Sequence, residues 1–246
     1  MSIERKAIFL LTLSFMVNAT ASELSVGAGA VYNESIYRGY NENTHAVPII
    51  SYEGDSFYIR QTTLGYALFK NKRDEISLTG SWMPLKFDPA DNDDNAMKQL
   101  DKREGSAMAG AAWYHHENWG SLKVSAAADI LDNSSGWVGE LSYFRPLALG
   151  KLSITPAVGV YYYDDAFNRY YYGVSSHEAR RSGLSSWSPG SSWMPYMGLT
   201  MKYPLTRNLV LLANATYSVL PDEIKNSPMV DRDDSLTLLA GVSWRF

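Results

Sequence analysis

The most constraining feature of this chain is a two-residue alternation of apolar and polar side chains over several long segments. In the last one, SLTLLAGVSWRF (235–246), every even position is apolar and the odd positions are mostly small or polar. The same split occurs in segments 121–130, 151–163 and 193–203. Because successive side chains of a β-strand point to opposite faces, this pattern predicts strands that have one apolar face. The sequence therefore predicts an all-β fold.

A soluble β-sandwich alternates in the same way, so other features must separate it from a membrane barrel. The expected strands are about 10 to 12 residues long, which suits tilted membrane strands better than the shorter strands of soluble sheets. Charges within the strands fall on the less apolar face, and aromatic residues gather near strand ends, as in the girdles of membrane barrels. These aromatic residues are Trp82, Trp113, Tyr114, Trp137, Tyr161, Tyr162, Tyr163, Trp193, Tyr203, Tyr217 and Trp244. We therefore expect a closed antiparallel transmembrane β-barrel.

The N-terminus has the features of a secretory signal peptide. Arg5 and Lys6 precede an apolar run, which ends near the cleavage-site pattern Ala19-Thr20-Ala21. The run is too short for a membrane helix, which needs about 20 apolar residues. We expect residues 1–21 to be removed and residues 22–246 to form an outer-membrane barrel. The chain has no cysteine, so disulfides cannot stabilise it.

The lengths of the connections predict how the strands are arranged. The expected short connections are 70–74, 115–119, 145–150 and 204–208, and the long ones are 84–105, 164–191 and 219–234. Outer-membrane barrels have short periplasmic turns and long external loops. Segment 56–69 can be one strand or a hairpin, and single-chain bacterial barrels have even numbers of strands. We favour twelve strands with a break near Thr62 and Thr63, and ten strands are the alternative.

Several charged residues inside the expected strands are candidates for the barrel lumen. They are Arg60, Lys123, Asp129, Glu140, Lys202 and Arg245. They could line an aqueous path or pair with one another and close it. Side chains fill the interior of a barrel of about eight strands, whereas a channel remains in a barrel of about sixteen. A barrel of 10 to 12 strands lies between these two cases. Both arrangements stay open at this point.

Ser175, His177 and Glu178 lie close together in the longest expected external loop. A catalytic nucleophile needs a base within hydrogen-bond reach and a third group that orients this base, which local spacing cannot establish. We therefore expect a folded external loop, anchored at the membrane interface by Tyr170 to Tyr172. Gly173, Gly183 and Gly190 would permit its reversals, and Glu178, Arg180 and Arg181 would pair locally or with lumen charges.

Two other clusters resemble metal sites only loosely. His115, His116 and Glu117 are adjacent, so their side chains point to different faces of a strand. The acidic loop 87–105 lacks the glycine and the closing glutamate of a calcium loop. We expect no metal and no cofactor, and the net charge of −4 argues against a nucleic-acid partner.

Several stretches together are similar to the MltA-interacting protein (MipA)/OmpV family of outer-membrane proteins, and to its YiaT-like branch in particular. These are LSVGAGAVYNESIYRGYNENT, SYEGDSFYIRQTTLGY, YYYGVSSHEARRSGLSSWSPG and GVSWRF. The family loop motif is matched by Tyr171, Tyr172, Gly173, Val174, Ser175, Glu178, Ala179, Ser182, Gly183 and Leu184. Trp187 stands where the family usually has tyrosine, ahead of Pro189 and Gly190.

The resemblance implies a non-enzymatic barrel of the Gram-negative outer membrane, surrounded by lipid and lipopolysaccharide. The family's namesake is regarded as a scaffold between a lytic transglycosylase and a penicillin-binding protein, so the resemblance implies a role in peptidoglycan turnover. A small-solute channel is the alternative function, and a surface lipid or peptide hydrolase ranks below both. Outer-membrane barrels in general end in an aromatic residue that the barrel-assembly machinery reads, so Phe246, with Trp244 before it, is the expected assembly signal.

Overall fold

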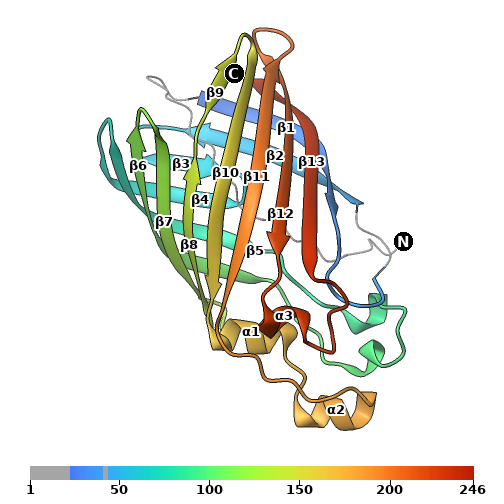
Figure 1. The fold of residues 1–246 in the computed structure, drawn as a ribbon. Coiled ribbons are helices and arrows are strands. Elements are labelled where there is room, and N and C mark those ends of the chain that lie inside the picture. Colours follow the sequence, from blue (N-terminus) through green and yellow to red (C-terminus); the bar gives the residue numbers. More distant parts are fainter. Residues whose placement is uncertain (1–22, 41–43) are drawn as a thin grey trace.

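The strands of this protein form one antiparallel sheet that closes on itself (Figure 1). The computed structural model describes residues 23–40 and 44–246, so the expected signal peptide lies outside the described residues. The strands are β1 (Glu23–Asn33), β2 (Thr44–Glu53), β3 (Phe57–Arg60), β4 (Thr63–Lys70), β5 (Asp74–Met83), β6 (Ser106–Glu117), β7 (Gly120–Asp129), β8 (Trp137–Phe144), β9 (Leu147–Leu149), β10 (Leu152–Tyr163), β11 (Ser192–Pro204), β12 (Leu209–Val219) and β13 (Asp234–Arg245). Strand β1 pairs with both β2 and β13, which closes the barrel.

The barrel wall contains twelve strands in the described residues, because β8 and β9 are one strand with a short interruption. Both pair with β10 in the same register, and the N–H of Arg145 still donates to the carbonyl of Pro156 at 3.1 Å. Pro146 has no N–H and interrupts the ladder. The expected connection 145–150 is therefore mostly strand, and the chain reverses at Gly150, which has φ 62°.

Segment 56–69 is a hairpin. Strand β3 ends at Arg60, β4 begins at Thr63, and Gln61 at the turn has a positive φ of 57°. The prediction of twelve strands with a break at this point is confirmed, and the alternative of ten strands is wrong.

The apolar faces of the strands point outward. In β13, Leu238, Val242 and Trp244 are exposed on the outside, whereas Ser235 and Thr237 are buried inside. Most of the aromatic residues expected near strand ends, such as Trp82 and Trp193, also point outward. The exceptions are Tyr114, Tyr161 and Tyr163, which are buried in the interior. The expectation of a girdle position is wrong for these three, because each has the parity of the inner face.

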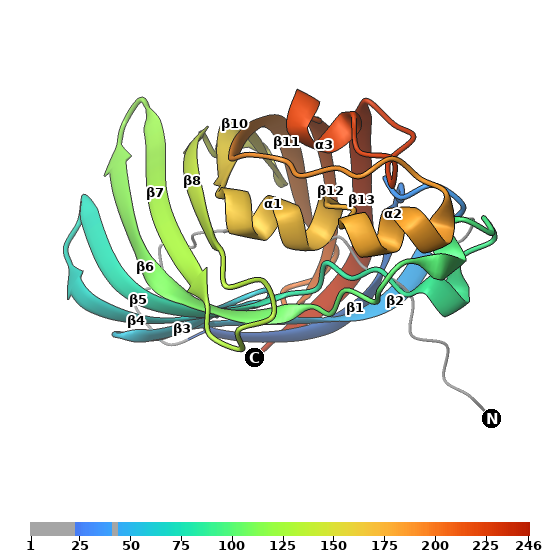
Figure 2. The same cartoon turned by 90° about the horizontal axis from the view of Figure 1, so that it is seen from below.

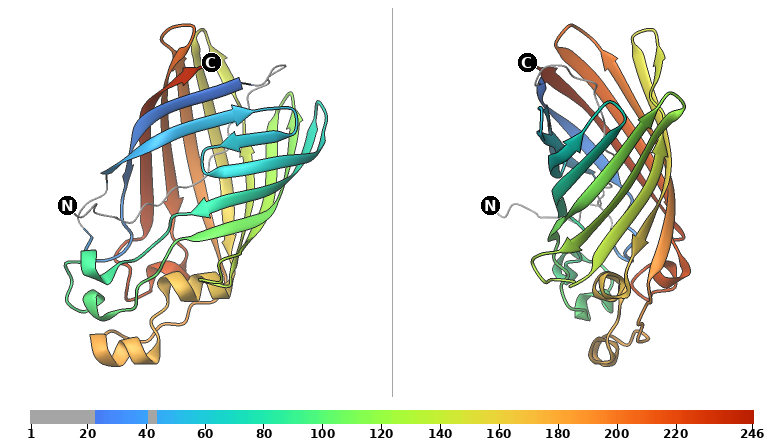
Figure 3. Two further views of the ribbon diagram at one scale, coloured as in Figure 1. Left: turned by 180° about the vertical axis from the view of Figure 1, so that it is seen from behind. Right: turned by 90° about the vertical axis from the view of Figure 1, so that its left-hand side faces the viewer.

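The two ends of the barrel differ in the length of the connections between strands. The short turns and the C-terminus lie at one end, and the long loops lie at the other (Figure 3). These loops carry 3-10 helices η1 (Pro89–Asp91) and η2 (Met97–Gln99) and α-helices α1 (Asp165–Tyr172), α2 (Ser176–Ser182) and α3 (Asp222–Lys225). Seen from this end, α1 and α2 lie over one side of the mouth of the barrel (Figure 2). No helix in the described part of the chain is long and apolar enough to span a bilayer.

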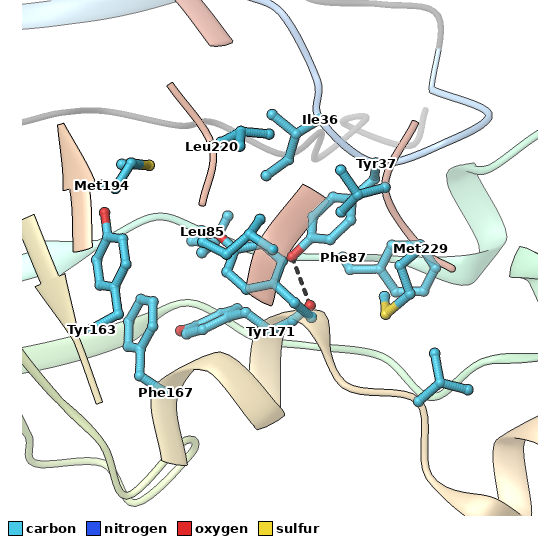
Figure 4. Packing of buried hydrophobic residues seen from close by; sticks show 14 of the residues in the cluster. Ile36, Tyr37, Leu85, Phe87, Tyr163, Phe167, Tyr171, Met194, Leu220 and Met229 are labelled. Atoms are coloured by element: carbon cyan, nitrogen blue, oxygen red, sulfur yellow. Dashed lines mark hydrogen bonds between the residues drawn. The ribbon is translucent and has the colours of Figure 1, made fainter. Parts of the chain in front are cut away.

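The loops 34–40, 84–105, 164–191 and 220–233 pack together into one structure that we call the cap. Its core contains fully buried side chains from each of these loops, together with residues at the ends of β10 and β11 (Figure 4). Ile36, Phe87, Tyr171 and Ile224 represent the four loops. The largest buried apolar cluster in the described residues therefore lies at one end of the barrel, among the long loops, and not in its middle.

Candidate functional site

A layer of charged side chains lies on the inner face of the barrel wall, below the cap. Arg60 on β3 lies between Glu53 on β2 and Glu75 on β5. Its Nε and Nη2 donate to Glu53 at 2.6 and 3.0 Å, and its Nη1 donates to Oε1 of Glu75 at 3.0 Å. All three residues are buried. A guanidinium held in two directions by carboxylates is a strong, geometrically specific contact.

A second pair completes this layer on strands β7 and β8, which follow β5 and β6 around the wall. Lys123 on β7 donates to Oε2 of Glu140 on β8 at 2.6 Å, and the hydroxyl of Tyr196 donates to Oε1 at 2.7 Å. The ring of Tyr114 lies between the two groups, with the Arg60 guanidinium carbon 5.4 Å and the Lys123 Nζ 6.0 Å from its centroid. Together, these ionic side chains form what we call the ion-pair layer: Glu53, Arg60, Glu75, Lys123 and Glu140.

Two glycines allow aromatic rings to lie close against neighbouring strands inside the lumen. Tyr58 pairs with Gly65 across β3 and β4, and a Cβ at Gly65 would lie 1.9 Å from the tyrosine ring. Tyr196 pairs with Gly159 in the same way, with a corresponding distance of 2.7 Å. Each ring therefore covers a neighbouring strand where only glycine leaves room.

The other candidate lumen charges lie away from this layer. Asp129, at the outer end of β7, accepts hydrogen bonds from Ser106 and from the N–H groups of Leu131 and Ser134, so it fixes the β7–β8 loop. Lys202 is half-buried on the inner face of β11, near the short-turn end. Arg245 pairs with Glu23 at 2.5 Å at the rim of that end. The structure thus brings Arg60, Lys123 and Glu140 into one layer and leaves the other three candidates outside it.

The loop motif 170–190 contains the last residues of α1 and the whole of α2. Helix α2 begins with a capping box: Ser175 Oγ accepts the N–H of Glu178, and the Glu178 carboxylate accepts the N–H of Ser175 at 2.9 Å. His177 is exposed, and its Nδ1 lies 3.4 Å from Nη1 of Arg181. Ser175 and Glu178 therefore serve as a helix cap. The spacing Ser-x-x-Glu was a sequence signal for this helix start.

Glu178 also joins α2 to the β5–β6 loop. Its Oε1 accepts from Arg103 Nη2 at 2.7 Å and from the N–H of Asp101 at 3.0 Å, and the Glu178 side chain is buried. Burial would raise the pKa of this carboxyl, but the hydrogen bonds from Asp101, Ser175 and Arg103 outweigh it and lower the pKa to about 2. The carboxylate therefore stays ionised over most of the acidic range.

Other expectations for this loop are met only in part. Arg181 pairs with Asp101 at 2.5 Å, whereas Arg180 is exposed. Tyr171 and Tyr172 are fully buried in the cap, so the expected membrane-interface anchor is wrong for them. Burial raises the pKa of both phenols well above the usual value. They are held by backbone contacts, including a hydrogen bond from the Tyr37 hydroxyl to the carbonyl of Tyr171 at 3.1 Å (Figure 4).

The glycines of the loop differ in conformation. Gly183 ends α2 in the left-handed region with φ 77°, as expected for a reversal. Gly173 has a negative φ, and a Cβ there would lie 2.3 Å from the carbonyl of Arg169. Its role is close packing at the end of α1. Gly190 likewise has no positive φ.

The clusters that loosely resemble metal sites have other partners. His115 Nδ1 lies 2.8 Å from Asp74, and His116 Nδ1 lies 2.7 Å from Ser121. In the acidic loop, Asp88 and Asp94 accept backbone N–H groups at the starts of short helical turns. Across the described residues, no group of three or more His, Asp or Glu side chains could hold a metal ion.

Several residues of these sites were not singled out from the sequence, namely Glu53, Glu75, Arg103 and Tyr196. Glu75 shares the parity of Ser77 and Thr79, which was a signal for an inward side chain. Nothing local in the sequence indicates that Arg103 meets Glu178.

Comparisons with known proteins agree with this architecture. The family model described as MltA-interacting protein MipA matches residues 26–246. The chain is 64% identical to the outer membrane protein YiaT of Escherichia coli O157:H7, over the full length of both chains. It is 36% identical to the MltA-interacting protein of Escherichia coli K12, over 96% of each chain.

A more distant relative is OmpV of Vibrio cholerae, with 25% identity over 89% of this chain and 84% of the relative. The agreement extends over the barrel and the cap alike, and the relatives are outer-membrane proteins by name. The chain belongs to the MipA family of β-barrel proteins and is a protein of the outer membrane.

Proposed function

We propose that this protein is a non-enzymatic interaction scaffold of the cell envelope, which binds enzymes of peptidoglycan turnover at its periplasmic end. The observation that supports the proposal is that both the ion-pair layer and the packed cap take up space along the barrel axis and leave less room for an aqueous path. A diffusion channel needs a continuous aqueous path, whereas a scaffold needs only a stable wall and an exposed surface.

The periplasmic end offers such a surface on the hairpin of β9 and β10. This hairpin and the adjacent β11–β12 turn reach farthest from the cap (Figure 1). All three residues of β9 are exposed, and Leu147, Leu149 and Leu205 present apolar side chains there. A standard interface buries about 800 Å² on each partner, so neighbouring turns would have to contribute together.

The partners we propose are a lytic transglycosylase and a penicillin-binding protein. The name of the 36% identical relative supports the first of them, because that protein is described as interacting with MltA. The second partner rests on the same family role and has no separate structural support.

Capture of a purified lytic transglycosylase by the protein in proteoliposomes tests the proposal. We expect Leu147→Ser with Leu149→Ser to weaken capture about tenfold or more, because the central apolar contacts of an interface contribute most of its affinity. Lys151→Ser, on the same hairpin, is the matched control and should change capture little. Equal capture by the wild type, the double leucine variant and Lys151→Ser would contradict the proposal that this hairpin is the docking surface.

Planar-bilayer recordings of the same preparation test the channel alternative. We expect no reproducible conductance steps while gel mobility shows a folded, heat-modifiable barrel. Ion-selective steps that change when Lys123 or Glu140 is neutralised would favour a small-solute channel instead. A hydrolase has less support, because Ser175 caps a helix in this structure.

Phe246 gives a further prediction about assembly. Its side chain is exposed, and its N–H donates to the carbonyl of Leu24 at 3.0 Å at the closing strand pair. Deleting Phe246 should lower the amount of heat-modifiable barrel in the membrane more than it lowers total protein. The control is the substitution Arg207→Ala in the full-length chain, because Arg207 is exposed in a nearby turn. Equal losses of folded and total protein would contradict an assembly signal read by the barrel-assembly machinery.

A further inference from the structure

Among residues 23–40 and 44–246, part of one strand edge in the barrel wall has no ladder partner. Strand β3 is four residues long and pairs with residues 51–53 of β2, so within this described part residues 44–50 of β2 form a ladder with β1 and with no second strand. The N–H of Gly54 donates towards β3, to the carbonyl of Phe57 at 3.0 Å. Because backbone groups alternate in direction along an antiparallel strand, the even-numbered residues of 44–50 turn their backbone groups to this open side. Pro48 is one of them, and it lacks the N–H that a neighbouring strand would use.

The open side of β2 is one border of an interrupted region of the wall that we call the lumen window. Its second border is the tip of the β3–β4 hairpin, where the carbonyl of Thr62 accepts the N–H of Trp82 at 3.3 Å. The cap forms its outer border, since Tyr40 contacts the backbone of Asp88, and Arg38 pairs with Asp94 at 3.0 Å. The outward side chains at this window are apolar, including Ile50, Leu64 and Trp82. Lipid therefore faces the window from outside.

A cavity of about 100 Å³ lies inside the barrel, between the ion-pair layer and the cap. Lys123 and Glu140 line its floor, and Leu85 and Phe167 line its roof. Its lining also includes Trp82, whose side chain is 50% exposed on the outer surface of β5. Thr63 and Trp82 thus belong both to the cavity lining and to the border of the window.

The cavity combines apolar walls with hydroxyl groups. Met83, Met108 and Val138 contribute apolar surface, and Thr63, Ser81 and Ser125 contribute hydroxyls. Tyr161 also lines the cavity and is 5% exposed, and its hydroxyl interacts with the hydroxyl of Tyr196.

The charge of the floor restricts what can bind. The Lys123 ammonium is matched by the Glu140 carboxylate 2.6 Å away, so this pair offers a bound molecule no net charge. A charged molecule would lose its hydration without an opposite charge to compensate. An apolar cavity of about 150 Å³ in another protein accommodates benzene, so this smaller space suits at most one ring or a short chain, with room gained by rearrangement of the flexible Met83 and Met108 side chains.

We propose that this cavity binds small neutral molecules that have an apolar body and one hydroxyl group, and that they enter from the lipid phase through the lumen window. The apolar body contacts the methionine and leucine side chains, and the hydroxyl bonds to the hydroxyl groups of the wall. This inference goes beyond the proposed scaffold role and does not depend on it.

The test uses 4-fluorophenol as the probe and ¹⁹F NMR of the full-length mature protein in lipid nanodiscs. We expect a saturable bound signal in the wild type, above the linear partitioning into nanodiscs that lack the protein. Ala127→Trp, which places a large side chain on the cavity lining, should weaken binding about tenfold or more. Ala126→Trp, on the outer face of the same strand, is the matched control and should bind as the wild type does.

Further variants keep the test decisive if Ala127→Trp fails to fold. Ser125→Leu also fills the cavity and should weaken binding in the same direction. Fluorobenzene, which lacks the hydroxyl, should bind roughly two- to tenfold more weakly than 4-fluorophenol. Thr63→Trp, at the window, should slow exchange of the probe. Only linear partitioning in the wild type would overturn the site, and an unchanged exchange rate in Thr63→Trp would overturn the lateral route.

Discussion

Replacing Arg60 with alanine should lower the free energy of unfolding by about 3–5 kcal/mol, because it leaves buried carboxylates without their counter-ion. Arg60 is 4% exposed and bonds to Glu53 and Glu75, which are themselves buried. The guanidinium also lies 3.7 Å from the centroid of the Tyr58 ring, so the substitution removes packing as well as charge. Urea unfolding in detergent micelles, followed by the loss of the heat-modifiable form, measures the effect.

The matched control is Arg73→Ala. Arg73 pairs with Glu117 at 3.2 Å, but its side chain is 69% exposed in a short turn. Exposed ion pairs contribute between about 0 and 1 kcal/mol, so this variant should unfold nearly as the wild type does. Equal effects of the two substitutions would show that the ion-pair layer does not stabilise the barrel. Arg60→Lys should fall between wild type and Arg60→Ala, because one ammonium cannot bond to both carboxylates in the same fork geometry.

Replacing Arg103 with alanine should open the cap while the barrel stays folded. Arg103 joins the β5–β6 loop to α2 through Glu178 at 2.7 Å, and both side chains are less than 10% exposed. Removing one partner of such a buried pair costs about 3–5 kcal/mol. Because the cap is formed by loops, we expect faster protease cleavage within residues 84–105 and 164–191 with little change in heat-modifiability.

Lys102→Ala is the neighbouring control. Lys102 also has acidic partners, Asp88 at 3.3 Å and Glu104 at 2.7 Å, but its side chain is half exposed. We expect much slower cleavage in this variant than in Arg103→Ala. Similar cleavage rates in the two variants would mean that the Arg103–Glu178 pair does not hold the cap closed.

The pH dependence of cleavage gives an independent check of this pair. The pKa of Glu178 is lowered from 4.5 to about 2, so the carboxylate stabilises the folded cap fully above pH 4.5. This stabilisation is lost as the pH falls from 4.5 through about 2. With an acid-active protease, the wild-type cap should remain resistant near pH 4, and Arg103→Ala should become sensitive at higher pH than the wild type. Identical pH profiles would contradict the role of Arg103.

The hairpin at residues 56–69 shows how far local sequence can determine a membrane barrel. The alternation of apolar and polar residues predicted the inward and outward faces of the strands that flank this hairpin. The even number of strands in bacterial barrels required a break near Thr62. The same reasoning misplaced Tyr171 and Tyr172, because tyrosine favours both wet interfaces and buried aromatic clusters. Composition alone does not separate these environments, whereas the packing of four loops does.

The sequence by itself determined the strands, their inward and outward faces and the order of short and long connections in this protein. These properties follow from a period of two and from local turn residues, so they need no knowledge of distant parts of the chain. Only the tertiary structure decided which inward charges meet. Arg60 and Glu53 are seven residues apart, but Arg103 and Glu178 are separated by 75, and Tyr196 reaches Glu140 from 56 residues away. Alternation places a side chain on the inner face, but its partner depends on how the closed barrel brings distant strands and loops across the same lumen.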